Sequence, residues 1–209
     1  MATEAVLAAT GLCIDGPRGP LVVDMHLSVA AGRTVALVGE SGSGKSMTAK
    51  ALTGLLPSGV TARGEVRVAG ATVQLGSRAG AETLASARGT RISLLLQNPF
   101  TSLSPVHRCG PQVAASLPPG LDTAAEIARR LDEVDLPERV AAMYPFELSG
   151  GMRQRVALAA SLASDPTVLI GDEPTTALDV TTQREVLDLV QRLQRDRGMA
   201  FVLITHDLG

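Results

Sequence analysis

Two short stretches of the sequence combine residue types that bind phosphate and activate water. The first, GESGSGKS at 39–46, directly follows the apolar run TVALV and fits the pattern G-x-x-x-x-G-K-[ST]. In this pattern the glycines let successive backbone N–H groups point at phosphate oxygens. A helix beginning at Lys45 would add the positive end of its dipole. The expected ligand is therefore a nucleoside triphosphate.

Side-chain chemistry assigns roles within this loop. Lys45 is expected to contact the β- and γ-phosphates, and the Ser46 hydroxyl is expected to ligate Mg²⁺. The predicted ATP-binding residues are Gly39, Glu40, Ser41, Gly42, Ser43, Gly44, Lys45 and Ser46. A chance glycine-rich turn is the competing interpretation, but the apolar strand before the loop and the helix after it argue against that.

The second stretch, VLIGDEP at 168–174, ends in two adjacent carboxylates. Its apolar residues predict a buried strand with Asp172 and Glu173 at the carboxyl end, the edge where α/β sheets bind ligands. Asp172 is expected to hold Mg²⁺ directly or through water, and Glu173 is expected to polarise an attacking water. A solvated acidic turn before Pro174 is the alternative, which a phosphate loop in the same chain makes the weaker interpretation.

Apolar strands alternating with helices would position these residues. The predicted strands span 34–39, 64–70, 91–97, 167–172 and 200–205, and the predicted helices span about 45–55 and 182–197. Residues 70–80 are small and glycine-rich and are interpreted as loop. This order predicts an α/β fold with a mostly parallel sheet and a helical insertion.

The insertion is expected between about residues 98 and 163, where strand character disappears. Thr123 and Glu126 have the spacing of a capping box, which predicts a helix start there. The chain is thus interpreted as one domain, with a nucleotide-binding core at 1–97 and 164–209 and a helical subdomain at 98–163.

Charge, cysteine content and apolar runs limit the partners and the compartment that can be expected for this chain. The net charge of −2 gives no electrostatic reason to expect nucleic acid. The two cysteines lack CxxC spacing, which favours a reducing compartment, and with His26 and His107 they form no recognisable metal-ligand pattern. The first residues lack the features of a signal peptide, and no apolar run approaches the roughly 20 residues of a membrane-spanning helix. We therefore expect a soluble chain.

A third stretch makes the pattern specific. ELSGGMRQR at 147–155 places two glycines where a helix should begin. Taken in order, GESGSGKS, Gln97, LSGGMRQR, VLIGDEP, TALD and ITHD resemble the ATPase subunit of an ABC transporter through essentially the whole chain. The resemblance implies a P-loop NTPase fold with a mostly parallel core sheet, a small antiparallel β region and an inserted helical subdomain that carries the LSGG signature.

The resemblance also implies roles for further residues. Gln97 would belong to the Q-loop, which senses Mg²⁺ and the membrane partner, and His206 would be the switch histidine at the γ-phosphate. Catalysis would rest on Glu173, His206 and Gln97, and the Mg²⁺ of Mg-ATP on Ser46, Gln97 and Asp172. In this family two ATPase subunits stack head to tail, and each supplies its signature and D-loop to the ATP of the other. The residues concerned are Leu148, Ser149, Gly150, Gly151 and Asp179.

The function implied is that of an ATP-hydrolysing translocase subunit peripheral to the cytoplasmic face of the cell membrane. It would pair with an identical or paralogous ATPase, act on separate membrane permease subunits, and serve an extracytoplasmic substrate-binding protein indirectly. QNPFTSLSP and YPFELSGGMRQR resemble the oligopeptide, dipeptide and nickel import branch, and Phe146 with residues 55–66 looks closest to nickel-import ATPases. Residues 98–105 are the candidate membrane-subunit contact, with Phe100 and Leu103 either exposed or packed inward.

Two features depart from the family pattern. The family usually stacks adenine on an aromatic side chain before the phosphate loop, where this sequence offers only Ile14 or Asp15. Family members also continue well beyond the switch histidine, so a C-terminal part is expected to be missing after Gly209. One alternative is therefore a regulatory or vestigial cassette that binds nucleotide and hydrolyses it poorly. Another is an ABC ATPase acting on DNA or ribosomes, against which the compact stretch from Gln97 to Ser149 argues.

Overall fold

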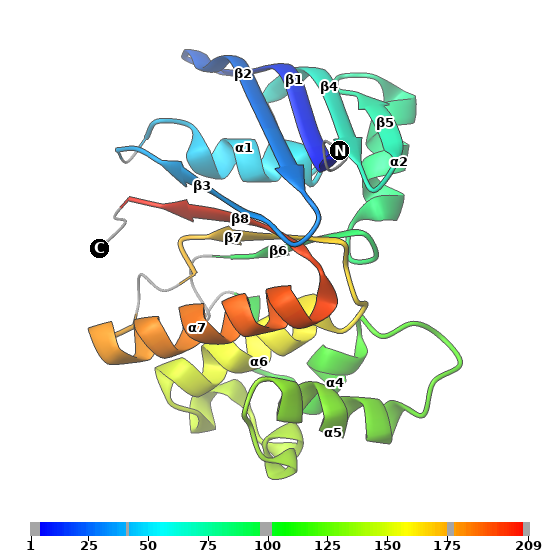
Figure 1. Ribbon diagram of the computed structural model, residues 1–209, viewed down its shortest axis with the longest axis vertical. Helices are drawn as coiled ribbons and strands as arrows, with labels where there is room; N and C mark the ends of the chain where they lie inside the picture. Colours follow the sequence, from blue (N-terminus) through cyan, green and yellow to red (C-terminus); the bar gives the residue numbers. More distant parts are fainter. Residues whose placement is uncertain (1–4, 41, 97–101, 175–177, 207–209) are drawn as a thin grey trace.

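Two four-stranded sheets form the framework of the molecule (Figure 1). The computed structural model describes residues 5–40, 42–96, 102–174 and 178–206. The antiparallel sheet has the order β2-β1-β4-β5 and consists of β1 (Ala5–Gly16), β2 (Gly19–Ala30), β4 (Thr61–Val68) and β5 (Ala71–Gln74). The parallel sheet has the order β3-β8-β7-β6 and consists of β3 (Thr34–Val38), β8 (Ala200–Thr205), β7 (Val168–Asp172) and β6 (Ile92–Leu95). The predicted α/β class with a parallel core and an antiparallel region is thus confirmed.

The helices cover both faces of the parallel sheet. Figure 1 shows α1 (Lys45–Leu52) between the two sheets, with α7 (Val180–Arg197) and α6 (Gly150–Leu162) on the opposite face of the parallel sheet. Beyond α6 lies an outer layer formed by α4 (Cys109–Ala114) and α5 (Thr123–Glu133). The other helices whose bounds lie within the described residues are α2 (Arg78–Ala87) beside β5 and two short 3₁₀ helices, η1 (Glu138–Ala142) and η2 (Pro145–Glu147). In the part of the chain described, no helix is both long and apolar enough to cross a bilayer.

Alternation along the central strands divides the interior into two cores. In β7, Val168 and Ile170 face the core shared with α1 and the antiparallel sheet, whereas Leu169 faces the core shared with α6 and α7. In β8, Phe201 likewise belongs to the helical side. Successive side chains of a strand point to opposite faces, so strands covered on both sides must be apolar throughout. This explains why both strands are readily recognised as continuous apolar runs.

Two local predictions are wrong. Residues 70–80 were expected to be loop, but β5 pairs antiparallel with β4 and α2 begins at Arg78, capped by the Ser77 hydroxyl, which accepts from Gly80 N–H at 3.0 Å. The capping box expected at Thr123 is absent, because Asp122 caps α5 by accepting from the first backbone N–H groups of the helix. An aspartate is as good a cap as a threonine, so the helix starts one residue earlier than its periodicity suggests.

Candidate active site

The phosphate loop joins β3 to α1 and depends on glycine at its end. Gly42 and Gly44 have φ of 85° and 88°, in the left-handed region that favours glycine. A β-carbon at position 44 would lie 2.6 Å from Val22 Cγ2 and 2.7 Å from the Leu21 carbonyl oxygen. Strand β2 therefore lies directly against the start of α1. Ser41, which belongs to the predicted ATP-binding set, lies outside the described residues.

Lys45 folds back over the loop that precedes it. Its ammonium donates to the backbone oxygens of Gly39 (2.6 Å) and Glu40 (2.7 Å), and it lies 3.5 Å from Ser43 Oγ. These acceptors are uncharged, and a phosphate oxygen would offer the ammonium a stronger, charge-assisted bond. The predicted phosphate ligands of the loop are thus grouped around one cationic side chain.

A hydrogen bond joins the two motifs across 126 residues of sequence. Ser46 Oγ donates to Asp172 Oδ1 at 2.9 Å, which links the first turn of α1 to the carboxyl end of β7. Burial of Asp172, only 5% exposed, raises the pKa of its carboxyl. The Ser46 hydrogen bond opposes that shift in pKa, the charge of Glu173 adds to it, and the nearby lysines reduce it. A hydroxyl and a carboxylate meeting at the phosphate loop are the oxygen donors that Mg²⁺ prefers, so these residues fit the ion.

Glu173 and His206 lie together beside this pair. Glu173 adopts a φ of 47°, unusual for a residue with a side chain, and its backbone N–H donates to the Ile204 carbonyl of β8 at 2.9 Å. Its carboxylate oxygen Oε2 lies 3.6 Å from His206 Nδ1. A left-handed conformation of this kind costs about 1–3 kcal/mol and persists only when neighbouring contacts hold it, as is common at functional sites. The bond to β8 is such a contact.

The predicted signature and D-loop residues form a second group. Ser149, Gly150, Gly151 and Asp179 all line a surface pocket of about 560 Å³ at the first turns of α6 and α7. Ser149 caps α6 by accepting from Met152 N–H at 3.2 Å, and Asp179 caps α7. Leu148 does not line this pocket, since it is 3% exposed and belongs to the core of the helical side.

The structure keeps these two groups on different sides of the parallel sheet. The phosphate loop leads into α1 between the two sheets, whereas the pocket lies at α6 and α7 on the other face (Figure 1). One chain therefore presents two separate groups of predicted site residues, called half-sites below, one with the phosphate loop and carboxylates and the other with the signature and D-loop. Gln97 lies outside the described residues, as does Phe100.

A match to a family model decides the identity of the fold. The model described as ABC transporter matches residues 22–176, which is most of the chain. This chain belongs to the ABC transporter family.

Individual ABC relatives agree with that assignment. The chain is 43% identical over 220 residues to the glutathione import ATP-binding protein GsiA of Salmonella choleraesuis, covering 98% of this chain and 35% of that protein. It is 39% identical over 214 residues to the oligopeptide transport ATP-binding protein OppD of Lactococcus lactis, covering 99% of this chain and 62% of that protein. The chain thus spans between about a third and under two thirds of the length of these relatives.

Solved ABC structures share the fold. CbiO1 of Clostridium perfringens, part of the ABC transporter complex cbiONQ, superposes with a TM-score of 0.81 at 25% identity, covering 98% of this chain and 79% of that one. The ATP-binding cassette MJ0796, in a dimeric post-hydrolysis state bound to ADP and Pi, also gives 0.81 at 26% identity, covering 97% of this chain and 88% of that one.

Burial shows where Ile14 and Leu103 point. Ile14 is fully buried, so it offers no surface to a nucleotide base. The neighbouring Asp15 accepts a hydrogen bond from Arg63 at 2.5 Å. Leu103 is 4% exposed and packs inward, in the core of the helical side. Of the two apolar residues considered for the membrane-subunit contact, Leu103 is therefore part of the core and is not exposed.

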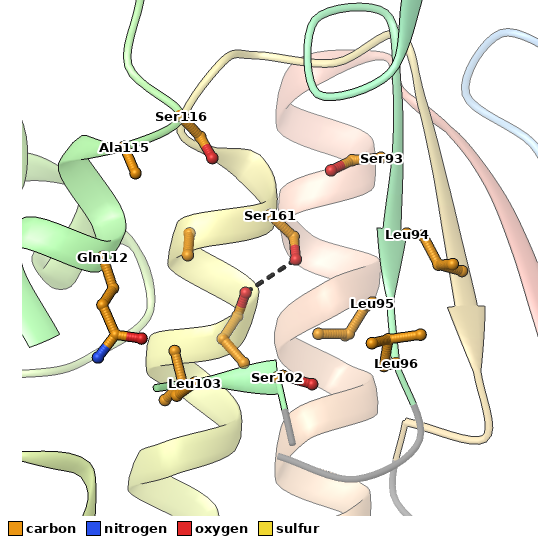
Figure 2. Close-up of a pocket in the computed structure, with 12 residues that line it drawn as sticks. Ser93, Leu94, Leu95, Leu96, Ser102, Leu103, Gln112, Ala115, Ser116 and Ser161 are labelled. Carbon is orange, nitrogen blue, oxygen red and sulfur yellow. Dashed lines mark hydrogen bonds between the residues drawn. The ribbon is translucent and has the colours of Figure 1, made fainter. Parts of the chain in front are cut away.

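Sequence reasoning missed a second pocket, of about 360 Å³, between β6, α4 and α6 of the ABC fold (Figure 2). Leu95 points toward it from β6, whereas Leu94 packs toward the opposite core, and Gln112 lines it from α4. The Gln112 amide fixes the segment before α4, because it donates to the carbonyl oxygens of Ser104 and His107. No local motif marks this pocket, since its walls come from four separate segments.

Proposed function

We propose that this chain binds Mg-ATP at Gly39–Ser46 and hydrolyses it as the ATP-binding subunit of an ABC importer. The observation that carries the proposal is the grouping of the phosphate loop with two carboxylates. Ser46 donates to Asp172 at 2.9 Å, and Glu173 lies 3.6 Å from His206. These groups come from distant parts of the sequence, and an ATP-hydrolysing site is the chemistry that uses all of them.

Each group has a defined task in that reaction. Lys45 and the loop N–H groups bind the β- and γ-phosphates, which orients the terminal phosphate for attack. Ser46 and Asp172, with the predicted ligand Gln97, would hold Mg²⁺, which supplies positive charge to the phosphate oxygens when bound. Glu173 accepts a proton from the attacking water, and His206 contacts the γ-phosphate.

The second half-site completes the proposal as a head-to-tail dimer. Ser149 and Asp179 mark the starts of α6 and α7, where free backbone N–H groups and helix dipoles favour an anion. The glycines after Ser149 leave that approach open. We propose that this pocket receives the γ-phosphate of ATP bound to a second identical or paralogous ATPase chain.

The proposed setting is an importer at the cytoplasmic face of the cell membrane. The names of GsiA and OppD make peptides, including glutathione, the favoured cargo class. Nickel, suggested by the resemblance around Phe146, is the alternative. Membrane permease subunits are the proposed direct partners, with an extracytoplasmic substrate-binding protein acting through them. Ser102 and Leu103, which belong to residues 98–105, line the pocket beside β6, and we propose it as the site where a permease segment docks.

Two substitutions test the proposed ATPase. Lys45→Ala should lower ATP affinity at least tenfold, because it removes the only cationic side chain that contacts the loop carbonyls of Gly39 and Glu40 among the described residues. Glu173→Gln should retain ATP binding and lose turnover by a factor on the order of 10²–10⁴. Arg78→Ala, at an exposed cation on α2, is the control and should change neither quantity. Unchanged ATP affinity in Lys45→Ala, or normal hydrolysis in Glu173→Gln, would contradict the proposal.

A further inference from the structure

Thr182, in the first turn of α7, touches both segments of the signature pocket. Its backbone N–H donates to Asp179 Oδ1 at 3.0 Å, and its hydroxyl donates to Asp179 Oδ2 at 2.8 Å. Its methyl group faces the other segment, because a β-carbon at position 151 would lie only 2.7 Å from Thr182 Cγ2. One half-buried side chain therefore contacts the D-loop through its polar end and the signature helix through its apolar end.

The polar contacts fix the Asp179 carboxylate. Both of its oxygens are engaged by Thr182, so the side chain cannot rotate without breaking a hydrogen bond. The same bonds lower the pKa of Asp179, because they favour the ionised carboxylate that accepts them. An ordinary helix cap requires only the backbone N–H bond, so the hydroxyl bond is an addition to the cap.

The apolar contact fixes the signature helix relative to α7. Gly151 has no side chain, and this lets the backbone of α6 reach the Thr182 methyl group. At Gly150 a β-carbon would make only an ordinary contact, 3.4 Å from Leu178 Cδ2. Gly151 thus has a packing role within one chain in addition to the open approach that it gives to a phosphate.

We propose that Thr182 is a positioning residue that holds Asp179 and the Gly150–Gly151 turn in one fixed arrangement. The two segments then meet a second chain as a single surface rather than as two independently moving loops. This inference rests on the proposed use of the pocket in a head-to-tail dimer. Thr182 itself acts only through Asp179 and the signature turn.

Two substitutions separate the two ends of the side chain. Thr182→Val keeps the methyl contact and removes the hydroxyl bond to Asp179, whereas Thr182→Ser keeps the hydroxyl and removes the methyl group facing Gly151. The same changes at the neighbouring exposed Thr181 provide matched controls. All variants are made in a Glu173→Gln chain, in which bound ATP should persist.

The measurements are ATP affinity at low protein concentration, the midpoint of thermal unfolding, and ATP-driven dimer formation by sedimentation. Thr182→Val should weaken the dimer about tenfold, since a hydrogen bond to a charged group is lost. Thr182→Ser should weaken it less, ATP affinity should stay within about twofold, and the Thr181 variants should match the parent. In a chain with Glu173 intact, Thr182→Val should lower kcat and leave KM for ATP unchanged.

Three results would overturn the inference. If both Thr182 variants dimerise like the parent, the residue does not position the surface. If dimerisation, ATP affinity and the unfolding midpoint fall together, its role is only structural. If the Glu173→Gln parent binds ATP and forms no dimer, the proposed head-to-tail function fails first, and this inference fails with it. Because the parent is measured separately, the last result is distinguishable from the other two.

Discussion

The contact between β2 and the start of α1 makes Gly44 a position of the phosphate loop where one added methyl group should be damaging. An alanine there must adopt a φ near 88°, which costs roughly 1–2 kcal/mol for a residue with a side chain. Its β-carbon would also lie 2.7 Å from the Leu21 carbonyl oxygen and 2.6 Å from Val22 Cγ2. The carbonyl belongs to the backbone, so β2 or the loop must move, at a further cost of roughly 1–3 kcal/mol.

Gly44→Ala should therefore lower the free energy of unfolding by roughly 2–5 kcal/mol, the sum of the strain and overpacking costs. It should also weaken ATP binding, because Lys45 and Ser46 follow directly in the helix that is displaced. Urea unfolding without nucleotide and an ATP titration measure the two effects.

Gly70→Ala is the matched control for this change. Gly70 has a φ of 83°, and no atom lies within 4 Å of the position that its β-carbon would occupy. It should lose only the roughly 1–2 kcal/mol of backbone strain and bind ATP normally. If the two variants unfold alike and bind ATP alike, the close approach of β2 to α1 does not require glycine, and the reasoning is refuted.

Substitutions at three further positions test single interactions. Ser46→Ala should lower the free energy of unfolding by about 1–3 kcal/mol in urea, because buried Asp172 loses a donor, and should weaken the Mg²⁺ dependence of ATP binding. Ser149→Ala should cost about 0.5–2 kcal/mol through loss of the α6 cap, whereas Ser149→Asn should restore that stability. The hydrogen bond from Arg130 lowers the pKa of Asp165 below 3.8, so it stabilises the fold above that pH and is lost as pH falls through the lowered value. The wild-type advantage over Asp165→Asn in thermal unfolding should therefore shrink as the pH falls below 3.8 and through the lowered pKa, and a pH-independent difference would refute this.

Elements with a strong local signal could be predicted from the sequence. The run AFVLIT at 200–205 coincides with β8 because a strand buried on both faces must be apolar throughout. Helix α7 could be placed from its apolar stripe and from Gly198, which ends it in the left-handed conformation. The helix begins at Val180, two residues before the predicted start, because the cap residue Asp179 sets its first turn and the apolar stripe does not.

Elements stabilised by tertiary contacts could not be predicted. Strand β5 has one buried apolar residue, Val73, and forms because β4 offers it a partner. The long β1–β2 hairpin lacks regular alternation, since its register shifts repeatedly and Gly11 and Asp24 adopt positive φ. The same irregularity explains why Ile14 was a wrong candidate for the base: across such shifts, the sequence does not say which face a side chain takes.

The candidate site shows a similar division between local and distant information. The glycines, Lys45 and the adjacent carboxylates were recognisable because their spacing is local. The contact of Glu173 with His206 depends on β7 and β8 being neighbours, so that their carboxyl ends meet at one edge of the sheet. The contact of Thr182 with Gly151 depends on how closely two helices approach, which no local pattern records.

The two half-sites are separate in space, and one short segment of chain connects them. Glu173 is fixed to β8 through its backbone N–H, and Asp179 caps α7 only six positions later. Asp179 is fixed to Thr182, and Thr182 packs against the signature helix. Each group is thus fixed to the core of the same chain, Glu173 through β8 and Asp179 through α7. In the proposed dimer, these fixed ends would set the geometry in which each chain meets the ATP held by its partner.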